Sequence, residues 1–204
     1  KNIKIFKGKP IIAWTIKNVI NSKKFSRVIV STDDKNIAKI AIKYGAEVPF
    51  YRPNYLANDY AGTKEVVDHS IKYLEKSSKK INIVGCFYAT SIFAKPNLIR
   101  KAFTLLSKKI RFIFLAKKID KQSYRSFSLD KQSVLSRSSN KIKKRSQDFK
   151  NNFQDLGQFY IGRHRTWKNQ KAILTKNSRA IVLKSWEATD IDELDDWKLA
   201  EKIF

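Results

Sequence analysis

The chain alternates between short apolar runs and longer segments whose apolar residues recur every three or four positions. Residues 10–21 show the second pattern and are predicted to form an amphipathic helix that starts at Pro10. The run 27–31 is β-branched, which is typical of a buried strand, and the run 81–87, the most apolar of the chain, is predicted to be a central strand. The same criteria predict helices at 35–44, 66–74, 96–105 and 195–204, and strands at 47–50, 112–116, 158–163 and 180–184.

Predicted strands and helices alternate over the first half of the chain. This alternation is typical of α/β folds, in which helices cover both faces of a parallel or mostly parallel sheet. We therefore predict a single α/β domain over residues 1–204. Between residues 117 and 153 the pattern weakens into short β-like pieces rich in Ser, Lys and Gln, which indicates a small insertion within that domain.

Polar residues follow three of the predicted strands at their carboxyl ends. They lie at positions 32–33, 90–91 and 190–192. In open α/β sheets, ligands bind in the crevice outside the carboxyl ends of the strands. The three polar stretches are therefore expected to meet at one ligand site.

Five carboxylates are packed into seven positions near the C-terminus. Asp190 and Asp192 are two apart, and side chains on an extended segment repeat with period two, so both are expected to point to one side, about 7 Å apart. Mg²⁺ prefers oxygen ligands, typically one or two carboxylates with water and substrate phosphates. We predict that this pair binds a divalent cation. Glu193, Asp195 and Asp196 are interpreted instead as the acidic first turn of the last helix.

The net charge changes the range of possible partners. The chain has 43 Lys and Arg against 18 Asp and Glu, a formal charge of +25, which favours a polyanionic partner such as a nucleotide or a nucleic acid. Most of the basic residues are Lys spread along the chain, which is usual for a solvated surface. The densest basic cluster, 141–145, lies in a Ser- and Asn-rich stretch that could contact an anion or could be a linker.

One cysteine, Cys86, excludes an internal disulfide and is interpreted as a small core residue. No apolar run reaches the roughly 18 to 20 residues needed to cross a bilayer, and no signal-peptide pattern is present. We expect a cytosolic protein. The sequence contains no methionine, not even at position 1, so we expect that its natural beginning is missing.

Seven short stretches in the same order resemble the bacterial cytidylyltransferases that make CMP-activated nine-carbon sugar acids. The resemblance runs from end to end of the chain. Residues 57–63, 88–91, 145–148 and 157–160 are most similar to the members that use pseudaminic acid. The seven stretches are Lys1-Asn2-Ile3, Gly8-Lys9-Pro10, Val30-Ser31-Thr32-Asp33, Arg52-Pro53, Leu56-Ala57-Asn58-Asp59, Ala89-Thr90-Ser91 and Asp190-Ile191-Asp192.

The resemblance implies a three-layer, Rossmann-like nucleotide-diphospho-sugar transferase fold and an Mg²⁺-dependent reaction. CTP and the sugar acid would give the CMP-sugar and pyrophosphate. Asp190 and Asp192 would carry Mg²⁺ on the triphosphate, Lys1 would pair with phosphate, and Asn2 would contact the nucleoside. The resemblance also implies a homodimer formed through residues 117–153 and a role in surface or flagellin glycosylation.

The resemblance also implies roles for the remaining site residues. Arg52 and Thr63 would border the cytosine pocket. The alternative interpretation is that Arg52 merely caps a turn and that Thr63 merely caps a helix. The sugar side would be lined by a further set, in which Arg145 would pair with the sugar carboxylate and the two tyrosines could also be core-edge aromatics. That set is Tyr88, Thr90, Arg145, Gln158 and Tyr160.

The chain also departs from the family pattern. Relatives place a strand and a Gly-rich, Arg-containing phosphate loop ahead of the position of Lys1. Ile92 replaces a usual Pro, Glu193 stands where Thr is common, and Gln154 and Leu156 change the approach to Gly157. These departures leave open that the chain is a catalytically incomplete module. Two further alternatives are a sialic or legionaminic acid as acceptor and a basic nucleic-acid-binding module.

Overall fold

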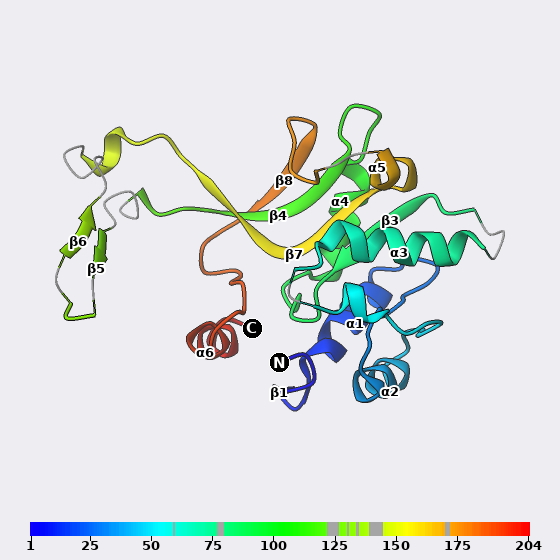
Figure 1. Cartoon of the computed structure of the whole chain (residues 1–204). Helices are drawn as coiled ribbons and strands as arrows, with labels where there is room; N and C mark the ends of the chain where they lie inside the picture. Colours follow the sequence, from blue (N-terminus) through cyan, green and yellow to red (C-terminus); the bar gives the residue numbers. More distant parts are fainter. Residues whose placement is uncertain are drawn as a thin grey trace.

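The computed structural model describes residues 1–58, 60–76, 80–121, 127–129, 131–133, 135–138, 145–169 and 172–204 (Figure 1). Its helices are α1 (Ile11–Asn21), α2 (Lys35–Lys43), α3 (Thr63–Glu75), α4 (Pro96–Leu105), α5 (His164–Asn169) and α6 (Leu194–Ile203), with short 3-10 turns η1 (Asn54–Leu56) and η4 (Ser146–Asp148). Its strands are β1 (Ile5–Phe6), β2 (Lys9–Pro10), β3 (Ile83–Phe87), β4 (Phe112–Lys118), β5 (Phe127–Leu129), β6 (Leu135–Ser138), β7 (Phe153–Arg163) and β8 (Ser178–Leu183).

The main sheet has four strands in the order β3-β7-β4-β8. β4 and β8 are parallel, whereas β7 is antiparallel to both of its neighbours, so β3, β4 and β8 point one way and β7 points the other. β7 is reversed because the chain leaves the sheet after β4 and returns directly beside it. The predicted α/β class is confirmed.

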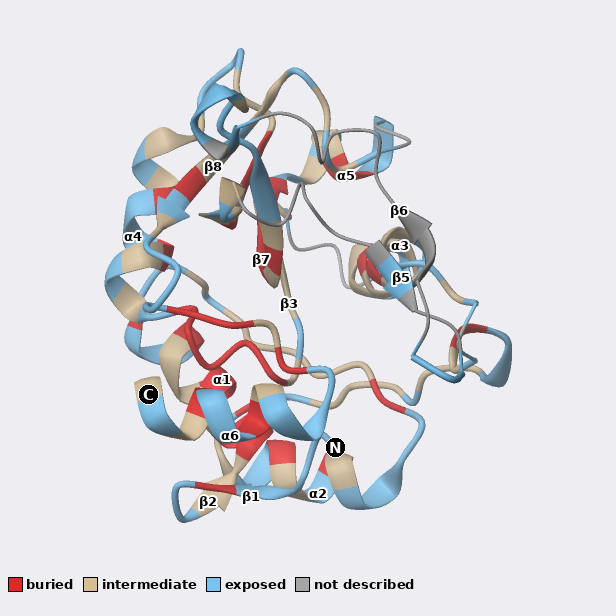
Figure 2. Cartoon of the chain, turned by 90° about the vertical axis from the view of Figure 1, so that its left-hand side faces the viewer, coloured by how far each residue is buried: buried red, intermediate tan, exposed pale blue. Residues whose placement is uncertain are grey.

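Helices cover both faces of this sheet. Neighbouring residues of a strand point to opposite faces, so one strand contributes side chains to both cores. Ile113 and Leu115 pack in the larger core with residues of α1, α4 and α6. Phe112 packs on the other face with Val67 of α3 and Trp167 of α5. The buried residues (red in Figure 2) lie on these helices, on β7 and on connecting segments such as residues 92–94.

The predicted strand at 81–87 lies at the edge of the sheet and not at its centre. β3 is hydrogen-bonded to β7 on one side, and it ends the strand order on the other. The predicted strands at 27–31 and 47–50 do not join this sheet either. One isolated parallel bridge joins them, Ile29 with Glu47, and a second lies just beyond them, Thr32 with Tyr51. Because β3 is at the edge of the described sheet, the prediction of a central strand at 81–87 is wrong.

The two ends of the chain pack together. The ring of Phe6 makes edge-on contacts with Trp197 and with Phe204, at centroid distances of 5.3 Å in both cases. Phe204 also lies edge-on to Trp14 of α1 at 5.0 Å. These contacts hold α6 against the start of the chain, so the acidic segment before α6 lies beside Lys1.

The region after β4 leaves the body of the molecule. β5 and β6 pair antiparallel as a small separate hairpin, which projects away from the main sheet at the left of Figure 1. Of the basic cluster 141–145, only Arg145 is among the described residues. None of the helices in the described part of the chain is long and apolar enough to cross a membrane.

Candidate active site

A cavity of about 1160 Å³ runs along the free edge of β3. Its walls include apolar side chains of α1, α3 and β3, and residues of the segment 24–33. Nine of the eleven predicted site residues line this one cavity, from segments far apart in the sequence: Lys1, Asn2, Arg52, Thr63, Tyr88, Thr90, Tyr160, Asp190 and Asp192. Gln158 and Arg145 do not.

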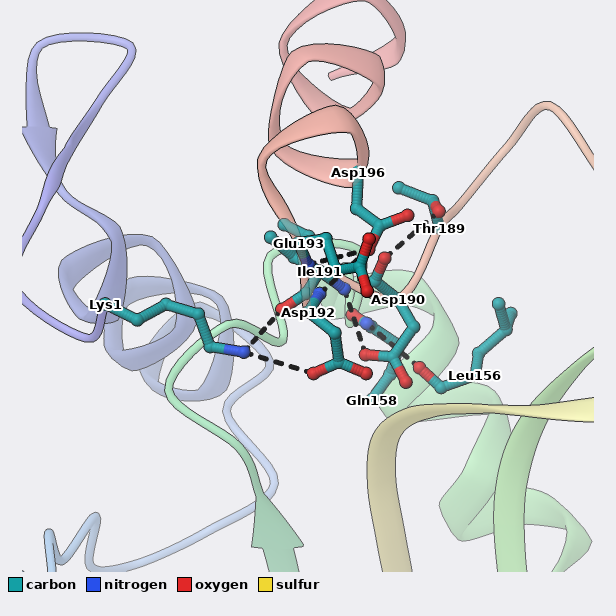
Figure 3. Close-up of polar contacts among 9 residues, drawn as sticks. All are labelled: Lys1, Leu156, Gln158, Thr189, Asp190, Ile191, Asp192, Glu193 and Asp196. Carbon is teal, nitrogen blue, oxygen red and sulfur yellow. Dashed lines mark hydrogen bonds and ion pairs between the residues drawn. The ribbon is translucent and has the colours of Figure 1, made fainter. Parts of the chain in front are cut away.

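Lys1 is held against the acidic segment (Figure 3). Its Nζ donates to the carbonyl of Ile191 at 2.7 Å and to Oδ1 of Asp192 at 3.1 Å. The Asp192 side chain is 75% exposed, so this ion pair is open to solvent and adds little to stability. Because the ion pair is open to solvent and weak, a phosphate can replace Asp192 as the partner of the Lys1 ammonium.

Asp190 is more enclosed than Asp192. Its Oδ1 accepts a hydrogen bond from the backbone N–H of Ile191 at 3.0 Å. Burial raises the pKa of the Asp190 carboxyl, and the nearby charge of Asp192 raises it further, while Lys1 acts in the opposite direction. The two carboxylates therefore repel each other in the absence of a cation.

The acidic residues after this pair belong to the start of α6, as predicted. Oδ2 of Asp196 accepts from the backbone N–H groups of Asp192, at 3.1 Å, and of Glu193, at 2.9 Å. These backbone hydrogen bonds lower the pKa of Asp196. Asp195 contacts Lys198 at 3.2 Å on the exposed side of the helix. The interpretation of this group as a helix start is confirmed.

The pairing of β7 with β4 is irregular where β7 passes the site. Phe114 lies opposite Tyr160, but Ala116 lies opposite Asp155. An advance of two residues along β4 is therefore matched by five residues along β7. The additional residues form a bulge, a feature often found beside active sites. Gly157 adopts a φ of +56° within it, and this turn carries the chain past Asp190.

Gln158 supports this bulge from inside and does not reach the cavity. Its side chain is 1% exposed. Its Oε1 accepts from the backbone N–H of Phe93 at 3.2 Å. Its Nε2 donates to the carbonyl of Leu156 at 3.2 Å, as Figure 3 shows. Both ends of the amide are thus used by the backbone, which places Gln158 behind the cavity wall.

Two tyrosines and a threonine form a polar wall of the cavity. The hydroxyls of Thr63 and Tyr88 lie 2.5 Å apart. The rings of Tyr88 and Tyr160 meet edge-on, with centroids 6.2 Å apart. Burial is the main cause that raises the pKa of both phenols, and the hydrogen bond to Asp155 raises the pKa of Tyr160 further.

Asp155 completes this wall, and sequence reasoning missed it. Its Oδ2 accepts a hydrogen bond from the hydroxyl of Tyr160, and its Oδ1 accepts from the backbone N–H of Gly157 at 3.1 Å. Gly157 was the sequence feature that could have pointed to Asp155. A glycine inside a strand pattern indicates a bulge, and a bulge changes the direction of neighbouring side chains.

The other predicted residues have simpler surroundings. The Arg52 guanidinium donates to the carbonyl of Ser31 and to its Oγ, the latter at 3.2 Å, so it braces a loop beside the cavity. Thr90 is buried. Arg145 lies between β6 and β7, with a side chain that is 74% exposed and that contacts Asp148 at 3.1 Å.

The carboxylate pair fits a magnesium ion that is bound together with a nucleotide. Among the described residues, no group of three or more His, Cys, Asp or Glu is placed to hold a metal by itself. Mg²⁺ does not need such a group, because it commonly uses one or two carboxylates and takes its other oxygens from water and substrate phosphates. The mutual repulsion of Asp190 and Asp192, together with the adjacent ammonium of Lys1, matches that arrangement.

The sequence matches the family model described as Cytidylyltransferase over residues 1–203. It is 32% identical over 206 residues to the pseudaminic acid cytidylyltransferase of Campylobacter jejuni, an alignment that covers 100% of this chain and 89% of the relative. It is 30% identical over 220 residues to the CMP-N,N'-diacetyllegionaminic acid synthase of Legionella pneumophila, covering 100% and 88%. Its fold is similar to that of CMP:2-keto-3-deoxy-manno-octonic acid synthetase complexed with CTP, with a TM-score of 0.64 and 13% identity over 93% of this chain and 86% of that one.

Proposed function

Because this chain belongs to the cytidylyltransferase family, we propose that it transfers CMP from CTP to a nine-carbon sugar acid and releases pyrophosphate. Pseudaminic acid is the acceptor we propose. One observation carries the proposal: a chain similar over its whole length to a pseudaminic acid cytidylyltransferase brings Lys1, Asp190 and Asp192 together at one large cavity.

The chemistry needs positioning and charge more than a nucleophilic side chain. A hydroxyl of the sugar acid attacks the α-phosphate of CTP, and pyrophosphate leaves. Such displacements are accelerated by holding the reacting groups in line and by stabilising negative charge on the phosphate oxygens. Lys1 would provide part of that charge, because its ammonium is exposed and already lies among oxygen acceptors.

Asp190 and Asp192 would hold Mg²⁺, which supplies positive charge to the phosphates when it is bound. Asp190 is the more rigid of the two, since it is partly enclosed and fixed by the N–H of Ile191. Asp192 is exposed and shares its Oδ1 with Lys1. Asp192 would therefore bind the metal through its other oxygen, Oδ2, or through Oδ1 after giving up this ion pair.

The rest of the cavity would divide between the two substrates. Asn2, Arg52 and Thr63 are proposed to border the nucleoside. Tyr88, Thr90 and Tyr160 are proposed to face the sugar acid. The role of Arg145 as a partner of the sugar carboxylate stays a prediction, since this residue lies outside the cavity of this chain.

The acceptor is tested by offering CTP and Mg²⁺ with pseudaminic, legionaminic and N-acetylneuraminic acids in parallel. The measurement is the initial rate of pyrophosphate release. The proposal expects release that depends on an added sugar acid and is fastest with pseudaminic acid. Faster release with either of the other two acids would reassign the acceptor, and no release with any acid would refute the proposed reaction.

The assembly of the protein is a further proposal. The β5–β6 hairpin stands away from the sheet, which favours its use as an arm between two copies of the chain. Light scattering after size-exclusion chromatography would distinguish a dimer from a monomer. A cytosolic location and a role in flagellin glycosylation stay predictions.

A further inference from the structure

We infer that the apolar part of the cavity is the place of one further β-strand, formed by residues that precede Lys1 in the complete protein and paired with the free edge of β3. The inference goes beyond the proposed function, because it concerns the part of the cavity that the proposed substrate residues do not line. It assigns an occupant of stated chemistry to that part: an extended segment that is apolar on both of its faces.

The free edge of β3 carries backbone groups that point into the cavity. The carbonyl of Asn82 accepts from the N–H of His164, just beyond the end of β7, at 3.0 Å. In an antiparallel pair, residues that bond to the partner strand alternate with residues that do not, so the backbone groups of Ile83, Gly85 and Phe87 face away from β7. These three residues line the cavity. β3 therefore offers N–H and C=O groups to a strand beside it.

A second backbone edge faces the same cavity. The N–H of Val30 donates to the carbonyl of Glu47 at 2.9 Å, and the carbonyl of Val28 accepts from the N–H of Glu47 at 2.8 Å. Ile29, between them, therefore points its own N–H and C=O away from residues 47–51, and it lines the cavity. Backbone groups in a protein interior are almost always paired. A strand between β3 and Ile29 would pair with both edges, which a hydrocarbon ligand cannot do.

The walls between these two edges are apolar on both faces of the sheet. Helices α1 and α3 cover opposite faces, and each contributes apolar side chains to the cavity. A strand points alternate side chains to the two faces, so the segment that fits here is apolar on both. CTP and a sugar acid are charged and polar, and the residues proposed for them gather near Tyr88, at the carboxyl end of β3. The apolar wall residues are Ile12, Ile16 and Val19 of α1 and Val67, Ile71 and Leu74 of α3.

The segment that precedes Lys1 is the occupant that the geometry favours. Lys1 and Asn2 line the polar end of this same cavity, where Nζ of Lys1 contacts Asp192. A strand with its carboxyl end toward Lys1 can continue into it through a turn. The Campylobacter jejuni relative, which is aligned with the whole of this chain, has further residues outside the alignment. The added strand would also explain why β3 has the apolar composition of a central strand, because β3 would lie inside the completed sheet.

Hydrogen exchange measured by mass spectrometry tests the inference on the complete protein and on the chain of 204 residues. Peptides that cover residues 83–87 report on the edge of β3. The matched control is β8, which ends the strand order on the other side of the sheet and whose outer edge gains no strand. A variant of the complete protein with one proline in the middle of the preceding segment removes the added hydrogen bonds. Circular dichroism verifies the fold of each protein.

We expect exchange of the outward amides of β3 to be at least about tenfold slower in the complete protein than in the shorter chain, and exchange at the outer edge of β8 to change less than about twofold. The proline variant should exchange at β3 as fast as the shorter chain. Where the shorter chain or the proline variant does not fold, the comparison of β3 with β8 inside the complete protein remains. The outward amides of β3 should then exchange at least about tenfold more slowly than those of β8.

Three results would overturn the inference. They are equally fast exchange at β3 with and without the preceding segment, a proline variant as protected as the complete protein, and β3 amides in the complete protein that exchange as fast as the outer edge of β8. Protection in the shorter chain alone that rises with protein concentration would assign the slot to a second copy and would overturn the inference too. None of these results bears on the reaction, which the rate of pyrophosphate release measures.

Discussion

A side-chain carbon on Gly157 would lie 2.9 Å from Oδ2 of Asp190, closer than such carbons approach other atoms in proteins. Gly157 also has a φ of +56°, a conformation that residues with a side chain rarely adopt. The missing side chain of Gly157 therefore leaves the space in which the Asp190 carboxylate lies. This contact joins the bulge of β7 to the proposed metal site.

Gly157→Ala is expected to displace the Asp190 carboxylate and to lower turnover at least about tenfold, since small misplacements of reacting groups are costly. Gly8→Ala is the matched control, because Gly8 has a φ of +80° but nothing within 4 Å of an added carbon. Both variants should lose about 1 kcal/mol of stability from backbone strain. Steady-state rates that fall equally in both variants would contradict a specific role for this contact.

Asp192→Asn should lower turnover roughly a hundred-fold or more and should raise the Mg²⁺ concentration needed for half-maximal activity, because it removes a charged ligand. The fold should be unaffected, since this side chain is 75% exposed. Mg²⁺ titrations of activity measure the effect, with Asp195→Asn as the control. A near-normal rate at the usual Mg²⁺ concentration would remove Asp192 from the site.

Gln158→Leu should lower the free energy of unfolding by about 1–3 kcal/mol, because the N–H of Phe93 and the carbonyl of Leu156 lose their partner in the interior. Gln154→Leu is the control, an exposed position on the same strand. Urea denaturation gives both values. Unchanged stability together with a higher Michaelis constant for the sugar acid would instead support direct contact between Gln158 and the substrate.

The contact between α3 and α5 should make stability depend on pH in the acid range. Glu75 accepts hydrogen bonds from Lys168 and His164, both at 2.9 Å, and Lys168 is the main cause that lowers the pKa of Glu75 below its usual 4.5. A lowered pKa stabilises the fold above the unfolded-state value and loses that effect as the pH falls through the folded-state value.

Glu75→Gln should therefore unfold at a lower temperature than the wild type at pH 7 and pH 5, by about 2 °C or less, because such exposed ion pairs are weak. The difference should shrink progressively below about pH 4.5. Calorimetric melting curves across this range provide the test, with Asp195→Asn expected to follow the wild type. A difference in unfolding temperature that grows below pH 4.5 would contradict this prediction.

The sequence predicted the parts of the fold that depend on local patterns. Helices and most strands were found because their apolar residues recur at fixed spacing. The edge position of β3 was not predicted, because an apolar strand whose free edge lies along a large cavity has the same composition as a central one. The reversed direction of β7 was not predicted either, because direction depends on where the chain returns after an excursion.

The site also contains residues that the sequence could predict and residues that it could not. Asp190 and Asp192 could be predicted, because a dense acidic stretch in a basic chain is visible in the sequence. The contribution of Asp155 depends on the additional residues that β7 carries opposite Leu115. A shift of one residue in a strand moves a side chain to the other face, so no periodic pattern could place Asp155 beside Tyr160.

The central claim is that this cavity joins CMP to a sugar acid with the help of Asp190 and Asp192. The most direct measurement is mass spectrometry of the products formed from CTP, Mg²⁺ and pseudaminic acid. It compares the wild type with a folded double variant, Asp190→Asn with Asp192→Asn. We predict CMP-linked sugar acid from the wild type and none above background from the variant; no such product from the wild type, or equal product from both, would contradict the account.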